Sequence, residues 1–185
     1  MQFDEHQQLN DFTGKRFAEK MKDSNLFSKK ETSRDSTEKP TVFIMVGLPR
    51  SGKSTYVEKY KGYKVIVSAD NLRYLVYGQR FWGPGEDMMW AVRKIVLTML
   101  MEQGIDIVID ETNTTVARRK PIIELARKHG YSVEAIVINT SKEVCIERAQ
   151  TEGDERIIPV IERMAEQFEP ISLEEVDYLY KIQTN

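Results

Sequence analysis

The chain has 185 residues, of which 41% are hydrophobic and 30% are charged, an ordinary composition for a globular domain. Its apolar runs are too short to span a bilayer and no secretory signal is visible, so we expect a cytoplasmic protein. A single cysteine, Cys145, excludes an internal disulfide and a multi-cysteine metal site. The formal net charge of −2 argues against a surface that binds nucleic acid everywhere, although one basic groove is compatible with it.

Residues 1–40 differ from the rest of the chain. Apolar residues at helical spacing predict a short amphipathic helix across residues 9–21. Residues 28–39 contain no apolar side chain, which is typical of a linker. We therefore predict an N-terminal extension over residues 1–40, which either docks a partner or packs on the domain, and one domain over residues 41–185.

From residue 41 onwards, apolar strands alternate with helices. The expected strands cover residues 41–46, 63–68, 105–110 and 133–138, and the expected helices cover residues 55–60, 86–103, 116–129, 142–150 and 159–168. The last residues are ambiguous, because a capping box at 172–175 precedes apolar residues that alternate like a strand, and we favour a short strand. This pattern predicts an α/β fold with a parallel sheet of four to five strands and helices on both faces. Ligands then bind at the carboxyl ends of the strands.

Residues 47–54 read Gly-Leu-Pro-Arg-Ser-Gly-Lys-Ser and lie between the first strand and the first helix. This is the Walker A pattern of a P-loop NTPase in its proper context, so it predicts binding of a nucleoside triphosphate. Lys53 is expected to reach the β- and γ-phosphates, and the Ser54 hydroxyl to help hold Mg²⁺. ATP is the expected donor, with GTP left open. The predicted nucleotide-binding residues are Gly47, Leu48, Pro49, Arg50, Ser51, Gly52, Lys53, Ser54 and Thr55.

Asp70 and Arg73 follow the second expected strand, three residues apart on a helical turn, so they share one face. Phosphoryl transfer to a hydroxyl needs a carboxylate to accept the proton and a cation near the acceptor. We assign these roles to Asp70 and Arg73. The alternative is a helix-capping aspartate beside a solvated arginine.

Asp110 and Glu111 end the third expected strand. An acid in this place is the usual magnesium partner in P-loop NTPases, so Asp110 is predicted to serve the metal together with Ser54. The sequence leaves open which of the two acids faces the site. Asn113 is predicted to hold the acceptor, with an ordinary turn as the alternative.

Arg148 and Arg156 follow the fourth expected strand, and either can supply the mobile arginine that neutralises the transferred phosphoryl group. Arg163 is expected to be a solvated helix residue. The glycine-rich loop at residues 78–85 carries two aromatic side chains, which either stack on a nucleobase or pack into the core.

Taken together, these residues resemble the P-loop kinase family (AAA_33-like) that contains the phage-type polynucleotide 5′-kinases. The resemblance covers about residues 41–168. The motifs that carry it are Gly47–Ser54, Asp70-x-x-Arg73, Thr112-Asn113 followed by Arg118-Arg119, and Glu147-Arg148. It implies an adenylate-kinase-like sheet with a small lid.

The resemblance also implies site residues. Asp70 would be the general base toward the acceptor hydroxyl, Arg73 would contact the neighbouring phosphate, and Arg118 and Glu111 would contribute to the acceptor site. One departure concerns the lid, where the family pattern has an arginine and this chain has Glu152. The lid role must then belong to Arg148, to Arg156 or to no residue.

The leading hypothesis is a magnesium-dependent kinase that moves the γ-phosphate of ATP to a hydroxyl, with a polynucleotide 5′-end, RNA or DNA, as the favoured acceptor. A second hypothesis keeps the enzyme and makes the acceptor a small molecule or a nucleoside. A third, from another class, is a nucleotide-binding interaction module that docks a partner through its N-terminal extension.

Overall fold

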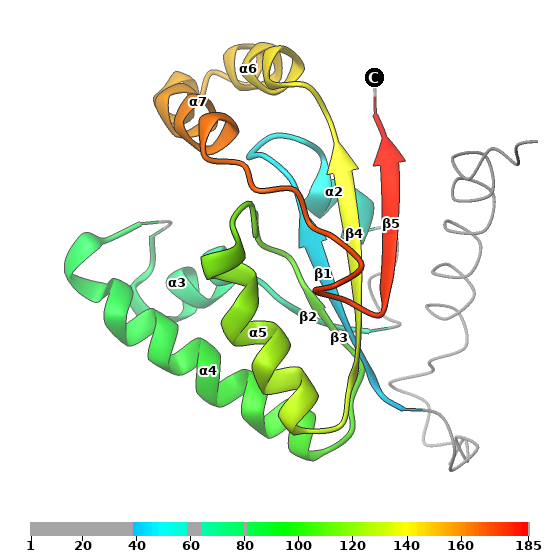
Figure 1. Ribbon diagram of the computed structural model, residues 1–185. Coiled ribbons are helices and arrows are strands. Elements are labelled where there is room, and N and C mark those ends of the chain that lie inside the picture. The colour runs from blue at the N-terminus through cyan, green and yellow to red at the C-terminus, as the bar shows by residue number, and fades with distance from the viewer. Residues whose placement is uncertain (1–38, 59–63, 80, 185) are drawn as a thin grey trace, which may run out of the picture.

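The computed structural model describes residues 39–58, 64–79 and 81–184 (Figure 1). The extension predicted over residues 1–40 lies almost entirely outside this part. Its helix, its linker and its docking role therefore stay predictions, as does the boundary at residue 40.

Five parallel strands form one sheet in the order β2-β3-β1-β4-β5. The strands are β1 (Thr41–Val46), β2 (Val65–Val67), β3 (Ile107–Ile109), β4 (Ser132–Asn139) and β5 (Tyr178–Gln183). The parallel sheet is confirmed, and the ambiguous C-terminal segment is a strand. β2 is shorter than predicted because Ser68 leaves the strand and caps the next helix, accepting a hydrogen bond from the Asn71 backbone N–H at 3.5 Å.

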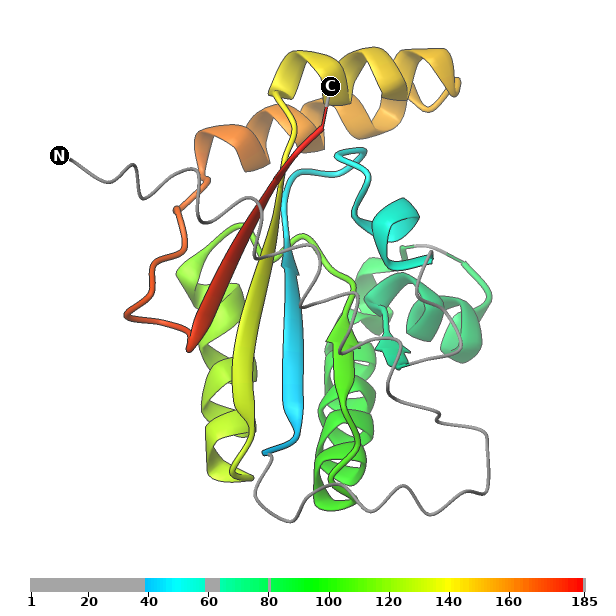
Figure 2. The ribbon, with the colours of Figure 1, turned by 90° about the vertical axis from the view of Figure 1, so that its right-hand side faces the viewer.

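Helices cover both faces of the sheet. They are α2 (Lys53–Glu58), α3 (Ala69–Tyr77), α4 (Glu86–Glu102), α5 (Val116–Lys128), α6 (Lys142–Thr151) and α7 (Ile158–Glu166), with 3₁₀ turns η1 (Gly83–Gly85) and η2 (Glu155–Ile157). Figure 2 shows α4 and α5 behind the sheet, whereas α6 and α7 lie beyond the carboxyl end of β4.

The central strand β1 explains this layering, because all six of its residues are buried. Val42, Ile44 and Val46 pack with side chains of α4 and α5, while Phe43 and Met45 pack with Val57 of α2. Alternate residues of a strand point to opposite faces, so a continuous apolar run is what a strand needs when both faces are covered. Burial of β1 thus fixes where the loop that follows it emerges.

Candidate active site

The phosphate loop leaves β1 under close packing constraints. A Cβ atom on Gly47 would lie 2.8 Å from the backbone oxygen of Ile138, so only glycine fits this position. The Gly47 N–H donates to the carbonyl of Thr112 at 2.9 Å. The start of the loop is therefore held between the end of β4 and the segment that follows β3.

Lys53 lies inside the loop and is buried. Its Nζ donates to the carbonyl oxygens of Gly47 at 3.0 Å and Leu48 at 2.7 Å. Burial lowers the pKa of Lys53 to about 8, and the negative charges of Asp110 and Asp70 partly oppose that effect. The ammonium group is thus enclosed at the place where the phosphate loop would cradle an anion.

Asp110, rather than Glu111, faces the phosphate loop. Burial raises the pKa of the Asp110 carboxyl, while a hydrogen bond with Ser54 and the charge of Lys53 act in the opposite direction. Hydroxyl and carboxylate oxygens are the ligands that Mg²⁺ prefers, and it usually takes one or two carboxylates together with phosphate oxygens. Ser54 and Asp110 fit that requirement, although the described residues contain no group of three metal-ligating acids, histidines or cysteines.

Glu111 points toward α4 instead. Both of its carboxylate oxygens accept from Arg93, with distances of 2.5 Å to Nε and 2.9 Å to Nη2, and both side chains are largely buried. Burial raises the pKa of Glu111, and the charge of Arg93 opposes the shift. The predicted contact between Glu111 and the acceptor stays a prediction, since the structure shows an arginine partner for it.

Asp70 and Arg73 lie together on α3, as their spacing predicts. The Asp70 side chain is exposed and accepts from Nη1 of Arg73 at 2.8 Å. The Nε and Nη2 groups of Arg73 both donate to Glu86, at 2.8 and 2.6 Å, and Tyr77 donates to the same carboxylate. Most of the charge of Arg73 is therefore already compensated by Glu86 and Asp70.

Three guanidinium groups lie around the ring of Trp90, on the side of the site where the acceptor is expected, which we call the acceptor side. Arg118, Arg93 and Arg73 lie 5.1, 5.3 and 5.6 Å from the ring centroid. Arg118 is exposed, and within the described part of the chain it has no ion pair. Of these three arginines, Arg118 is thus the one that can bind an incoming anion without first breaking an ion pair with a carboxylate.

Glu86, Trp90 and Arg93 were not predicted from the sequence. Their spacing of four and three residues puts them on one face of α4, and this signal is visible in the sequence. Nothing local shows which element that face meets.

Asn113 contributes to the packing of the segment that follows β3. It is buried with a positive φ of 45°, and its Nδ2 donates to the carbonyl of Met45 at 2.9 Å. Arg119 is fully buried and donates to both carboxylate oxygens of Glu175 and to the carbonyls of Asn113 and Glu169. Both residues tie the segment after β3 to its neighbours, and contact between Asn113 and an acceptor stays a prediction.

The two arginines that could serve the lid, Arg148 and Arg156, lie in different surroundings. Nη1 of Arg148 donates to the carbonyls of Arg50 and Ser51, both at 3.2 Å, whereas Arg156 is exposed on η2. Of these two arginines, the structure brings Arg148 to the phosphate loop.

The aromatic side chains of the loop at residues 78–85 do not enter the core. Phe81 is 69% exposed, and Trp82 packs edge-to-face on Tyr77 with ring centroids 5.6 Å apart. The alternative of core packing is therefore wrong for Phe81, and base stacking stays a prediction.

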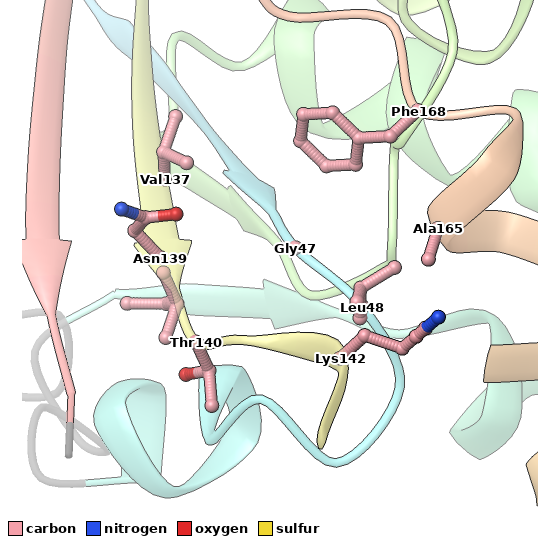
Figure 3. Close-up of a pocket in the computed structure, with 9 residues that line it drawn as sticks. Gly47, Leu48, Val137, Asn139, Thr140, Lys142, Ala165 and Phe168 are labelled. Carbon is pink, nitrogen blue, oxygen red and sulfur yellow. The ribbon is translucent and has the colours of Figure 1, made fainter. Parts of the chain in front are cut away.

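A cavity of about 280 Å³ lies beside the start of the phosphate loop, at the carboxyl end of β4 (Figure 3). Its lining comprises Gly47, Leu48, Val137, Ile138, Asn139, Thr140, Lys142, Ala165 and Phe168. Neither Asp70 nor Arg73 lines it, so it is separate from the acceptor side.

Comparison with known proteins places the chain in a family. The AAA_33 model, an AAA domain, matches residues 42–171. The chain is 33% identical over 116 residues to 6-phosphofructo-2-kinase/fructose-2,6-bisphosphatase 1 of Rattus norvegicus, an alignment that covers 52% of this chain and 25% of that protein. It thus spans about a quarter of the length of the curated relatives it matches.

Solved structures share the fold at low sequence identity. A chain of the Pnkp1/Rnl/Hen1 RNA repair complex has a TM-score of 0.58 and 18% identity, over 73% of this chain and 48% of that one. The APS kinase CysC of Mycobacterium tuberculosis has a TM-score of 0.55 and 17% identity, over 80% of this chain and 91% of that one.

None of the helices in the described part of the chain is long and apolar enough to span a bilayer. Since the family model covers more than half of the chain, including the whole phosphate loop, the protein belongs to the AAA_33 family of P-loop kinases.

Proposed function

We propose that this P-loop kinase transfers the γ-phosphate of ATP to an acceptor hydroxyl, with Asp70 as the general base. The observation that carries this proposal is the position of Asp70. It is an exposed carboxylate in the first turn of α3, close enough to the phosphate loop for its charge to act on the pKa values of both Lys53 and Asp110. A carboxylate there can take the proton of a hydroxyl that attacks the γ-phosphate.

The donor would be bound by residues 47–55, with Lys53 at the β- and γ-phosphates. Ser54 and Asp110 would hold Mg²⁺, which neutralises charge on the phosphates when it is bound. Arg148, which already contacts the backbone of the loop, would act on the transferred group from the lid. These roles follow from charge and position, because each side chain lies at the carboxyl edge of the sheet.

For the acceptor we propose a molecule with one phosphate near its hydroxyl, and the 5′-OH end of a polynucleotide is the favoured candidate. Arg73 and Arg93 are compensated by Asp70, Glu86 and Glu111. Arg118 is then available to bind one anion. The first phosphate after a 5′-terminal hydroxyl would be such an anion. The motifs around Asp70, Arg73 and Arg118 that resemble phage-type kinases favour a nucleotide end.

A second candidate is a phosphorylated small molecule. A single available arginine on the acceptor side suits a compact acceptor as well as a strand end. The half-chain similarity to a protein named 6-phosphofructo-2-kinase favours this candidate. The two differ in salt dependence, since contacts to several phosphates make affinity fall steeply with salt, whereas one contact does so weakly.

The test offers γ-labelled ATP with a 5′-OH oligonucleotide, a nucleoside 3′-monophosphate, the bare nucleoside and a sugar phosphate. We expect transfer to the first two, with Arg118→Gln raising their KM about tenfold and leaving the bare nucleoside unaffected. The control is Lys120→Gln, an exposed residue on the same helix. Transfer to the sugar phosphate alone would favour the second candidate, and ATP binding without any transfer would favour an interaction module.

A further inference from the structure

The phosphate loop and the lid are joined by two arginines that point in opposite directions. We call residues 148–157, from the end of α6 through η2, the lid segment. Arg148 reaches from this segment to the carbonyls of Arg50 and Ser51 and lies 3.7 Å from where a Gly52 Cβ would be. In return, Arg50 reaches from the loop to the carboxylates of Glu152 and Asp154.

The backbone at Arg50 is unusual for an arginine. Its φ is 64°, in the left-handed region that glycine adopts most readily. Among the described residues, only Asn113 is another non-glycine residue with positive φ. A side chain at such a position costs conformational free energy unless its contacts offset that cost. The local conformation therefore does not explain Arg50, whereas its side-chain contacts do.

The guanidinium of Arg50 contacts two carboxylates of the lid segment. Its Nη2 lies 2.6 Å from Asp154 and its Nη1 contacts Glu152, so one guanidinium joins two carboxylates of the lid segment. The Arg50 side chain is 23% exposed, and those of Asp154 and Glu152 are 30% and 54% exposed. Charge-assisted hydrogen bonds of this kind are stronger when they form a partly buried network than as isolated surface pairs.

The contact involves a position at which this chain departs from the pattern that it resembles. That pattern has an arginine in the lid at the place of Glu152, and here the lid carries the carboxylate while the loop carries the arginine. The departure at Glu152 and the strained arginine in the loop are thus two halves of one contact.

We propose that Arg50 is a positioning residue, which holds the lid segment on the phosphate loop through Glu152 and Asp154 and thereby keeps Arg148 against the loop. We call Arg50 with these two carboxylates the latch, and on this proposal it forms without the donor. When the latch is released, part of the binding free energy of the donor is needed to close the lid. Donor affinity therefore falls, while the chemical step is unchanged. Only this last consequence rests on the proposed phosphotransfer.

The first test measures the ligand-free protein by hydrogen–deuterium exchange. Arg50→Gly removes the guanidinium and suits the left-handed backbone, so the melting temperature should not fall. Amide exchange in residues 148–157 should nevertheless become about fivefold faster, the size expected for two partly exposed ion pairs. Glu152→Gln with Asp154→Asn should have the same effect, and combining all three changes should add nothing.

The matched control is Glu155→Gln, which removes an exposed carboxylate from the same segment and should leave its exchange unchanged. The second test measures ATP binding with Mg²⁺ by calorimetry. Both latch variants should weaken binding about fivefold. In the kinase assay the double variant Glu152→Gln with Asp154→Asn should raise the KM for ATP with kcat within about twofold.

The outcomes separate the latch from the proposed function. Faster lid exchange and weaker ATP binding support the latch even if no acceptor is phosphorylated. Unchanged lid exchange in both latch variants would overturn it. Tighter ATP binding in those variants would also overturn it, because the ion pairs would then hold the lid in a position that hinders the donor.

Discussion

The two sides of the candidate active site are built in different ways. The centre of the proposed donor side is one contiguous segment, residues 47–54, whose backbone carbonyls accept from the buried ammonium of Lys53. On the acceptor side, charged side chains of α3, α4 and the segment after β3 pair with one another around Trp90. Binding of a triphosphate is therefore a local property of the chain, whereas the choice of acceptor depends on how separate elements pack.

The charge balance of the two sides differs as well. Burial lowers the pKa of Lys53 to about 8, the nearby carboxylates of Asp110 and Asp70 partly oppose that shift, and its ammonium group donates to backbone carbonyls. Arg73 and Arg93 are each matched by a carboxylate through two hydrogen bonds. A polyanion is thus favoured on the donor side, while the acceptor side, where Arg73 and Arg93 are paired, suits a ligand that presents one anion to Arg118.

The largest effect that would sharpen this comparison is expected from Asp70→Asn. Asparagine keeps the shape of the side chain but cannot accept the proton of a hydroxyl, so kcat should fall by about 10²–10⁴-fold. Affinity for ATP should stay nearly unchanged, because Asp70 lies on the acceptor side. Single-turnover transfer and equilibrium ATP binding measure the two effects, and a variant of near-normal rate would remove Asp70 from the mechanism.

Lys53→Ala should act on the donor side. A preorganised charge at the β- and γ-phosphates is worth about 3 kcal/mol in the transition state, so transfer at saturating ATP should slow by at least about 10²-fold. The single-turnover rate is the measurement. A rate within about threefold of the wild type would mean that the loop binds the nucleotide without taking part in the chemistry.

Arg93→Met would break the paired acceptor side. It leaves the carboxylate of Glu111 buried without its partner, which should reduce the free energy of unfolding by about 3 kcal/mol at pH 8. Burial already raises the pKa of Glu111, and loss of Arg93 raises it further. Because the folded state then binds a proton more readily than the unfolded state, the loss should be smaller at pH 5 than at pH 8.

Denaturant unfolding at the two pH values provides the measurement for that prediction. The control is the double variant Arg93→Met with Glu111→Gln, which carries no unpaired charge and should recover most of the stability. A loss independent of pH would attribute the effect to packing against Trp90 instead.

A smaller effect is expected on the donor side, where Lys53 should take up a proton when ATP binds. The pKa of Lys53 is about 8 without ligand, and bound phosphates should raise it. Binding of ATP at pH 8.5 should therefore take up most of one proton, and at pH 6.5 almost none. Calorimetry in buffers with different ionisation enthalpies measures the uptake, and Lys53→Met should abolish it.

The smallest effect is expected from removal of residues 1–38. The cut must spare Pro40, whose carbonyl accepts from the Ser132 backbone N–H at 2.9 Å. The melting temperature should change by less than about 2 °C, because the sequence predicts a linker before β1. A large loss of melting temperature or of kinase activity would show that the extension is part of the domain.

The sequence by itself determined the order of the elements and the phosphate loop. The apolar run at residues 41–46, the glycines of the loop and most of the helices depend on neighbours along the chain, and they appear close to where they were expected. The helix α3 is an exception, because only a helical turn around Asp70 and Arg73 was predicted there. The strand β5 was also predicted, from the alternation of its apolar residues. The predicted end of β2 was wrong by one residue, because Ser68 caps α3 instead of continuing the strand.

Only the tertiary structure decided the partners of the charged residues. Nothing local shows that Asp110 faces Ser54 while the adjacent Glu111 faces Arg93, since that choice depends on how the chain leaves β3. The contact of Arg50 with the lid likewise joins residues about a hundred positions apart. Ion pairs between distant elements depend on side-chain geometry after packing, and no periodicity along the chain encodes that geometry.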